Sequence, residues 1–147
     1  MKRLFVVLLM LGLSVNLMAQ NKPVKQKGDS TVYFYGTMKL SSGMHVMTKI
    51  DSISTESEKV EQLLLTINES NKARVLGFAR TELGNNRLSA NINKKTNILE
   101  VKPTLRELKA AMDEFLRVND GKVYTLMQFM FNKPGQNEKI RVQRYEE

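Results

Sequence analysis

The sequence predicts an α+β domain, a two-layer sandwich in which two amphipathic helices pack on one face of a mainly antiparallel sheet of about six to seven strands. Three observations carry this prediction. Several short runs alternate apolar and polar residues, which is the period of a half-buried strand. Two other runs repeat apolar residues every three or four positions, which is the period of a helix. Both helical runs follow a Thr-x-x-Glu sequence, which is typical of a helix N-terminus.

The first nineteen residues have the pattern of a secretory signal peptide. Lys2 and Arg3 precede an apolar stretch over residues 4–13, and Ala19 offers a small residue at the cleavage point. The alternative is an uncleaved anchor, but the apolar run to Ala19 has only sixteen residues, whereas a bilayer core needs about 20. We therefore expect an exported protein, periplasmic or extracellular, with no transmembrane anchor after cleavage.

Residues 20–31 are polar and basic, and we expect them to form a disordered leader before the fold. Residues 32–147 are then a single α+β domain, long enough to bury one hydrophobic core. The chain contains no Cys, so its stability must come from packing and not from disulfides.

The first two strands are expected to form a hairpin. Residues 32–40 alternate between apolar and other residues. In the next run, residues 45–50, three residues fall on one side: Val46, Thr48 and Ile50. A three-residue loop over 42–44 would place Met38 opposite Thr48 and give the hairpin one mostly apolar face.

A helix is predicted next, over roughly residues 55–70. Thr55 and Glu58 form a capping box, and apolar residues follow at helical spacing: Val60, Leu63, Leu64 and Ile67. Two further strands are expected over residues 74–81 and 87–94, the second with one wet face.

The second half of the domain begins with a short extended piece over residues 97–102. Thr104 and Glu107 form another capping box, and the helix after it ends at residues 119–121. Its apolar side contains Leu105, Leu108, Ala111, Met112, Phe115 and Leu116. Residues 123–131 are apolar on both sides, as in a central strand or a subunit contact, and a last strand is expected over residues 139–145.

The blocks 55–94 and 104–144 therefore share one order of elements, a capping box, a helix and a hairpin. This order favours an internal pseudo-repeat, although any two helix–hairpin units resemble each other to this extent.

The residue types present in the chain do not indicate an enzyme. The chain has no Cys and one His, His45, so a Cys nucleophile is excluded. No Gly-x-Ser-x-Gly turn, Gly-rich phosphate loop or His/Asp/Glu cluster at metal spacing is present in the sequence. We therefore expect a non-enzymatic protein without a cofactor, with a cryptic hydrolase as a remaining alternative.

The apolar run at 123–131 is the candidate contact for a partner protein or a second copy of the chain. Within it we single out Tyr124, Leu126 and Met130. The sequence thus predicts a small exported interaction module that binds another envelope or extracellular protein.

Charge supports an alternative function. Loss of Lys2 and Arg3 with the signal lowers the formal net charge from +8 to +6. An uncovered sheet face would present four basic residues and three tyrosines: Lys39, Arg87, Lys139, Arg141, Tyr33, Tyr35 and Tyr145. Outside the cytoplasm such a face would bind lipid phosphate or acidic polysaccharide, and nucleic acid is an improbable ligand there. The simpler interpretation is that these cations solvate the wet side of a sheet.

A weak metal candidate lies at Met44, His45 and Met47, because thioether and imidazole groups are ligands that Cu(I) prefers. A Cu(I) carrier is therefore a further alternative, and a turn methionine beside a surface histidine is the simpler explanation.

Overall fold

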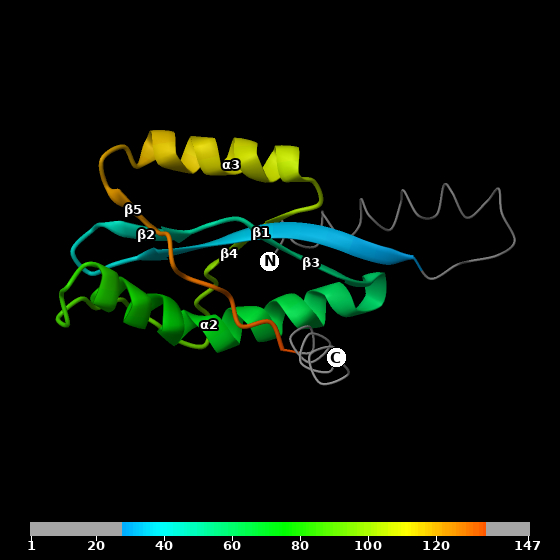
Figure 1. Cartoon of the computed structure of the whole chain (residues 1–147), viewed down its shortest axis with the longest axis horizontal. Helices are drawn as coiled ribbons and strands as arrows, with labels where there is room; N and C mark the ends of the chain where they lie inside the picture. Colours follow the sequence, from blue (N-terminus) through cyan, green and yellow to red (C-terminus); the bar gives the residue numbers. More distant parts are fainter. Residues whose placement is uncertain (1–27, 135–147) are drawn as a thin grey trace, which may run out of the picture.

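The computed structural model describes residues 28–134 and shows a five-stranded mixed sheet with two α-helices (Figure 1). In chain order the elements are β1 (Asp29–Lys39), β2 (His45–Thr48), β3 (Asp51–Glu56), the 3₁₀ turn η1 (Ser57–Lys59), α2 (Val60–Glu82), β4 (Leu99–Lys102), α3 (Leu105–Val118) and β5 (Val123–Leu126). The α+β class is confirmed. Because β1 begins at Asp29, the end of the expected leader belongs to the sheet. The expected signal peptide and the expected strand at 139–145 lie outside the described residues.

β1 is the central strand. It pairs antiparallel with β2 and β3 along one edge and with β4 along the other, and β5 pairs in parallel with β2. The sheet is mainly antiparallel, as predicted, but has five strands within residues 28–134 instead of six or seven. No helix in this part of the chain is long and apolar enough to cross a bilayer.

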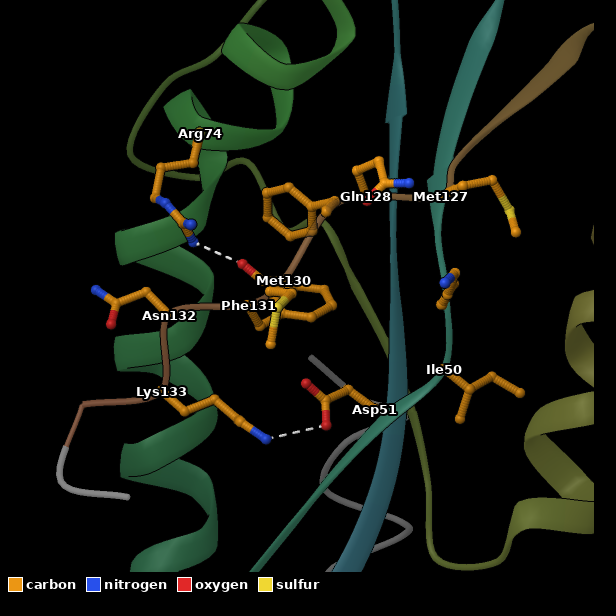
Figure 2. Close-up of a pocket in the computed structure, with 11 residues that line it drawn as sticks. Ile50, Asp51, Arg74, Met127, Gln128, Met130, Phe131, Asn132 and Lys133 are labelled. Carbon is orange, nitrogen blue, oxygen red and sulfur yellow. Dashed lines mark hydrogen bonds and ion pairs between the residues drawn. The ribbon is translucent and has the colours of Figure 1, made fainter. Parts of the chain in front are cut away.

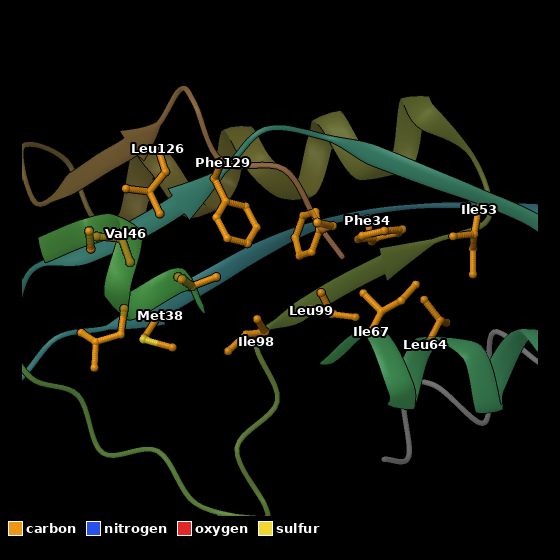
Figure 3. Close-up of a cluster of buried hydrophobic side chains, with 14 of the residues drawn as sticks. Phe34, Met38, Val46, Ile53, Leu64, Ile67, Ile98, Leu99, Leu126 and Phe129 are labelled. Carbon is orange, nitrogen blue, oxygen red and sulfur yellow. The ribbon is translucent and has the colours of Figure 1, made fainter. Parts of the chain in front are cut away.

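The two helices cover opposite faces of the sheet, so the prediction that both pack on one face is wrong. Val32 and Phe34 of β1 face α2 and belong to the larger core, whereas Tyr33 and Tyr35 face Leu108 of α3. The fold therefore has three layers, α2, sheet and α3. Figure 3 shows the larger core between the sheet and α2.

The hairpin between β1 and β2 has the predicted loop length but begins one residue earlier. The Leu40 N–H donates to the Met44 carbonyl (2.7 Å), so the loop is residues 41–43. Gly43, with φ 90°, occupies its left-handed position. As a result Met38 lies opposite Val46 and not opposite Thr48.

A β-bulge separates β2 from β3. Thr37 pairs with Met47 and Phe34 with Asp51, so two residues of β1 face three residues of the opposing arm. The extra residue reverses the alternation. Ile50 therefore packs on the α3 side, away from the side that Val46 and Thr48 occupy.

α2 is longer than predicted, and residues 74–81 are part of it instead of forming a strand. Val75, Leu76 and Ala79 are buried and continue the apolar face of the helix by another two turns. The predicted N-terminus is also wrong, because Thr55 lies in β3 and α2 follows η1 without a side-chain cap.

Residues 87–94 form no strand. Their alternating apolar side chains, Leu88, Ala90 and Ile92, nevertheless pack against the larger core. The alternation therefore indicates that one side of this segment is buried. It does not mean that the segment pairs with the sheet as a strand. Because neither residues 74–81 nor residues 87–94 form a strand, the block 55–94 has no hairpin after its helix, and the pseudo-repeat is not supported.

α3 begins as predicted. The Thr104 hydroxyl accepts from the Glu107 N–H (3.2 Å), and the Glu107 carboxylate accepts from the Thr104 hydroxyl (3.0 Å). Leu108 is the buried residue of the helix, while Leu105 and Leu116 are 38 and 37 % exposed at the margins of its apolar side.

Candidate functional site

A pocket of about 810 Å³ opens between the junction of β2 with β3 and the segment that follows β5, which begins with a turn at residues 127–128. We call this segment, residues 127–133, the strap. Figure 2 shows the strap between α2 on one side and Ile50 and Asp51 on the other. The strand predicted over residues 123–131 begins at Val123 as expected, but it ends at Leu126 and lies at the edge of the sheet, so its predicted length and central position are wrong.

Two phenylalanines fix the strap to the core. Phe129 and Phe131 are buried, and their rings meet edge to face with centroids 5.1 Å apart. Phe129 also packs on Phe78 of α2 (5.2 Å), and Phe131 packs on Phe34 of β1 (5.0 Å). This chain of T-shaped contacts links both neighbouring layers through the strap.

The Phe131 ring has room because β1 carries a glycine beneath it. A Cβ at Gly36 would lie 3.1 Å from Phe131 Cζ and 3.1 Å from Thr48 Cγ2. The Gly36 N–H donates to Thr48 Oγ1 (2.7 Å), which satisfies the buried hydroxyl beside the bulge. The close approach of strand and strap thus favours glycine at this position, because a methyl group would have to push both side chains aside.

Polar side chains of α2 bind the strap backbone along one edge. The Asn71 side chain donates to the Asn132 carbonyl and accepts from the Asn132 N–H, both at 2.8 Å. Arg74 Nη1 donates to the Met130 carbonyl (3.0 Å) and to Asn71 Oδ1 (2.6 Å). Farther along, a Glu82 carboxylate oxygen accepts from the Gln128 N–H (3.1 Å). The side chains of α2 thus bind backbone N–H and C=O groups of the strap, as the backbone of a neighbouring strand would.

The outward side of the strap is apolar and exposed. Met127 is 56 % exposed and Met130 is 77 % exposed, although the neighbouring Phe129 and Phe131 are buried. Anchored phenylalanines thus hold two flexible thioether side chains at the mouth of the pocket.

The charged residues around the pocket are mostly basic. Lys133 Nζ binds the Asp51 carboxylate (3.0 Å), so the one acidic lining residue is already paired. The Arg74 guanidinium stands 5.2 Å from the centre of the Phe129 ring. Lys49 is exposed and makes no ion pair with another residue of the described range 28–134. A carboxylate brought to the mouth of the pocket would therefore pair with the Lys49 ammonium.

The structure separates the three predicted partner-contact residues. Leu126 is completely buried in the larger core, and Tyr124 is half-buried against it. Met130 lies at the mouth of the pocket. Leu126 and Tyr124 do not form a contact surface, because β5 turns them toward α2.

The predicted basic sheet face is absent from the described part of the chain, since α2 and α3 cover both faces. Tyr35 is buried under α3, which raises its pKa to about 12, with the Glu100 carboxylate adding to the effect. Tyr33 packs in the same cluster. Lys39 and Arg87 are exposed on a strand end and a loop, and Lys139, Arg141 and Tyr145 lie outside the described residues.

The weak Cu(I) candidate is divided between surface and core. Met47 is buried with Tyr35 and Leu108, whereas Met44 is exposed beyond the hairpin loop. The His45 ring packs edge to face on Phe115 (5.4 Å). Burial, with Lys39 and Lys122 nearby, lowers the pKa of His45. Packing explains His45 and Met47 without a metal.

Sequence reasoning missed the α2 residues that hold the strap. Asn71 is fully buried, and Asn68 on the same helix face is 7 % exposed. Amides on the core side of an apolar stripe were the available signal, because a buried amide needs hydrogen-bond partners. Met127 and Lys49 were also missed, since nothing local distinguishes them from ordinary surface residues.

Comparison with protein-family models, with curated proteins and with solved structures found no match for this chain.

Proposed function

We propose that the chain is a small exported, non-enzymatic interaction module whose strap binds another envelope or extracellular protein. The observation that carries the proposal is the exposure of Met127 and Met130 on a segment held by buried aromatic and polar contacts. Methionine is over-used at protein-binding surfaces because its side chain adapts to the shape it meets. A fixed backbone lowers the entropic cost of docking. Export is the expectation from the signal-like N-terminus.

The pocket's residue types favour binding over catalysis. Its ionisable lining residues are Lys49, Asp51, Arg74 and Lys133. Asp51 is held by Lys133, and the pocket lining offers no hydroxyl or thiol beside a base. The apolar thioethers and the single paired carboxylate support a contact surface.

A capture experiment tests the proposal. The mature chain, residues 20–147, is immobilised and exposed to envelope and extracellular fractions of its source at low and high salt, and bound material is identified by mass spectrometry. Met130→Lys is the test variant. Leu65→Lys is the control, because Leu65 is 50 % exposed on α2 outside the strap.

We expect the wild type and Leu65→Lys to retain the same protein at high salt and Met130→Lys to lose it. A second copy of the chain as the captured protein would identify the module as a homodimer. Equal capture by Met130→Lys would contradict the proposal. Capture of only lipid or polysaccharide, and only at low salt, would contradict it as well and favour anion binding.

A further inference from the structure

The pocket beside the strap has apolar walls and an open mouth. The buried Phe129 and Phe131 line its inner side, and Ile50 lines it from the junction of β2 with β3 (Figure 2). At the mouth the described part of the chain leaves Met127 56 % and Met130 77 % exposed. The volume of about 810 Å³ lies within the range of about 300–1,000 Å³ that ligand-binding pockets occupy. The pocket is therefore large enough to admit a bulky side chain.

The open mouth favours a protein as the occupant over a free small molecule. Pockets for small molecules enclose about 70–90 % of the surface of the ligand. A small ligand placed against Met130 would stay exposed on its outer side, because Met130 is itself mostly exposed. A protein partner brings its own surface, which covers both methionines while one of its side chains enters the pocket.

The apolar residues that line the pocket favour an aromatic side chain. Thioether sulfur makes favourable contacts with aromatic rings, and Met127 and Met130 supply two such sulfurs at the mouth. On the inner side, Phe129 and Phe131 can offer edge-to-face contacts of the kind that they make with each other. Aromatic side chains buried in pockets also carry much of the binding energy of protein interfaces.

The charges around the pocket favour a carboxylate beside this aromatic side chain. Three cationic residues line the pocket, Lys49, Arg74 and Lys133, and one acidic residue, Asp51. Lys133 pairs with Asp51 (3.0 Å), and Arg74 Nη1 donates to the Met130 carbonyl (3.0 Å). Lys49 is exposed and makes no ion pair with another residue of the range 28–134. A carboxylate of the partner would therefore pair with Lys49, whereas a cation would be repelled.

We propose that the partner protein inserts one aromatic side chain into the pocket between Met130 and Ile50, and that a carboxylate close to it in the partner's sequence pairs with Lys49. This inference rests on the proposed function and names the chemistry that the strap recognises. The aromatic ring supplies the apolar contact area, and the ion pair selects acidic over basic partners.

The test selects linear dodecapeptides from a random library displayed on phage, with the mature chain as the target. Selected peptides are synthesised with Trp at the aromatic position, and binding is followed by Trp fluorescence, because the chain itself contains no Trp. Lys49→Glu is the test variant. Lys95→Glu is its control, because it changes the net charge equally in an exposed loop away from the pocket.

We expect selected peptides to contain an aromatic residue with Asp or Glu close to it in sequence. Replacing the aromatic residue by Ala should weaken binding by roughly tenfold or more. Lys49→Glu should weaken binding by roughly threefold to tenfold, and Lys95→Glu should leave it unchanged. A peptide with Lys in place of its acidic residue should regain affinity for Lys49→Glu, which would identify the paired charges.

Three results would each overturn the inference. The first is failure of the library to yield a binder, and the second is selection of peptides that lack an aromatic residue close to an acidic one. The third is equal affinity of Lys49→Glu and Lys95→Glu for the selected peptide, because binding would then not involve Lys49.

The two proposals fail in distinguishable ways. If the captured protein is still lost on Met130→Lys but the peptides give one of these three results, the interaction module stands and the aromatic–acidic mode of recognition is wrong. If capture is also indifferent to Met130→Lys, both are wrong.

Discussion

The side chain of Asn71 and the backbone of Asn132 exchange two hydrogen bonds of 2.8 Å, as paired residues of neighbouring strands do. Asn68 repeats the arrangement one turn earlier on α2. Its amide donates to the Thr96 carbonyl (3.0 Å) and accepts from the Ile98 N–H (2.8 Å). α2 thereby holds two chain segments without extending the sheet.

Replacing Asn71 by Ala removes both bonds and leaves the Asn132 backbone without its partner. We expect the free energy of unfolding to fall by about 1–3 kcal/mol in chemical denaturation. Asn86→Ala, at an exposed position, should change it by less than about 0.5 kcal/mol. Equal stability of the two variants would show that the Asn71 bonds do not hold the strap.

Two glycine substitutions should change the free energy of unfolding in opposite directions. In Gly36→Ala the new methyl meets Phe131 and Thr48 at 3.1 Å, so we expect a loss of about 1–3 kcal/mol. In Gly77→Ala the methyl meets no atom within 4 Å on α2, so the higher helix propensity of Ala should add about 0.5–1 kcal/mol. Thermal or chemical denaturation measures both. A stabilising Gly36→Ala would contradict the tight contact between β1 and the strap.

The α3 cap can be tested at one hydroxyl. Thr104→Ala removes the acceptor for the Glu107 N–H and should cost about 1 kcal/mol of stability. Thr104→Ser keeps that oxygen and should recover most of the loss. If Ser and Ala are equally destabilising, the cap is not the source of the effect.

Tyr35 predicts a loss of stability in alkali. Its folded pKa, about 12, lies above the ordinary value of 10.0 because burial, helped by Glu100, disfavours the phenolate. The contribution is fully present below pH 10 and is lost as pH rises toward 12. Denaturation of Tyr35→Phe should therefore show a weaker decline over this window than the wild type. Parallel declines would mean that Tyr35 ionises normally.

The elements that could be predicted from the sequence were those determined by residues close to one another in the chain. Thr104 and Glu107 marked the start of α3 because a capping box is local chemistry. The alternation of β1 and the three-residue length of the following loop were predictable for the same reason, although the loop begins one residue earlier than expected. The bulge at residues 49–50 was not, since one extra residue leaves no mark in the composition of the run.

The features that could not be predicted from the sequence depend on packing between segments far apart in the chain. Residues 74–81 contain Val75, Gly77 and Phe78, which a strand accepts as well as a helix does, and packing on the sheet selects the helix. The placement of α3 on the face opposite α2 depends on both faces of β1 being buried. Alternation along β1 does not reveal this when the second face carries Tyr33 and Tyr35.

The central claim is that α2 holds the strap in place, and amide hydrogen exchange on the mature chain tests it most directly. The Asn132 N–H, bonded to Asn71, should exchange slowly in the wild type and faster in Asn71→Ala. Equally fast exchange of the Asn132 N–H in both proteins would show that this bond does not hold the strap and would contradict the claim.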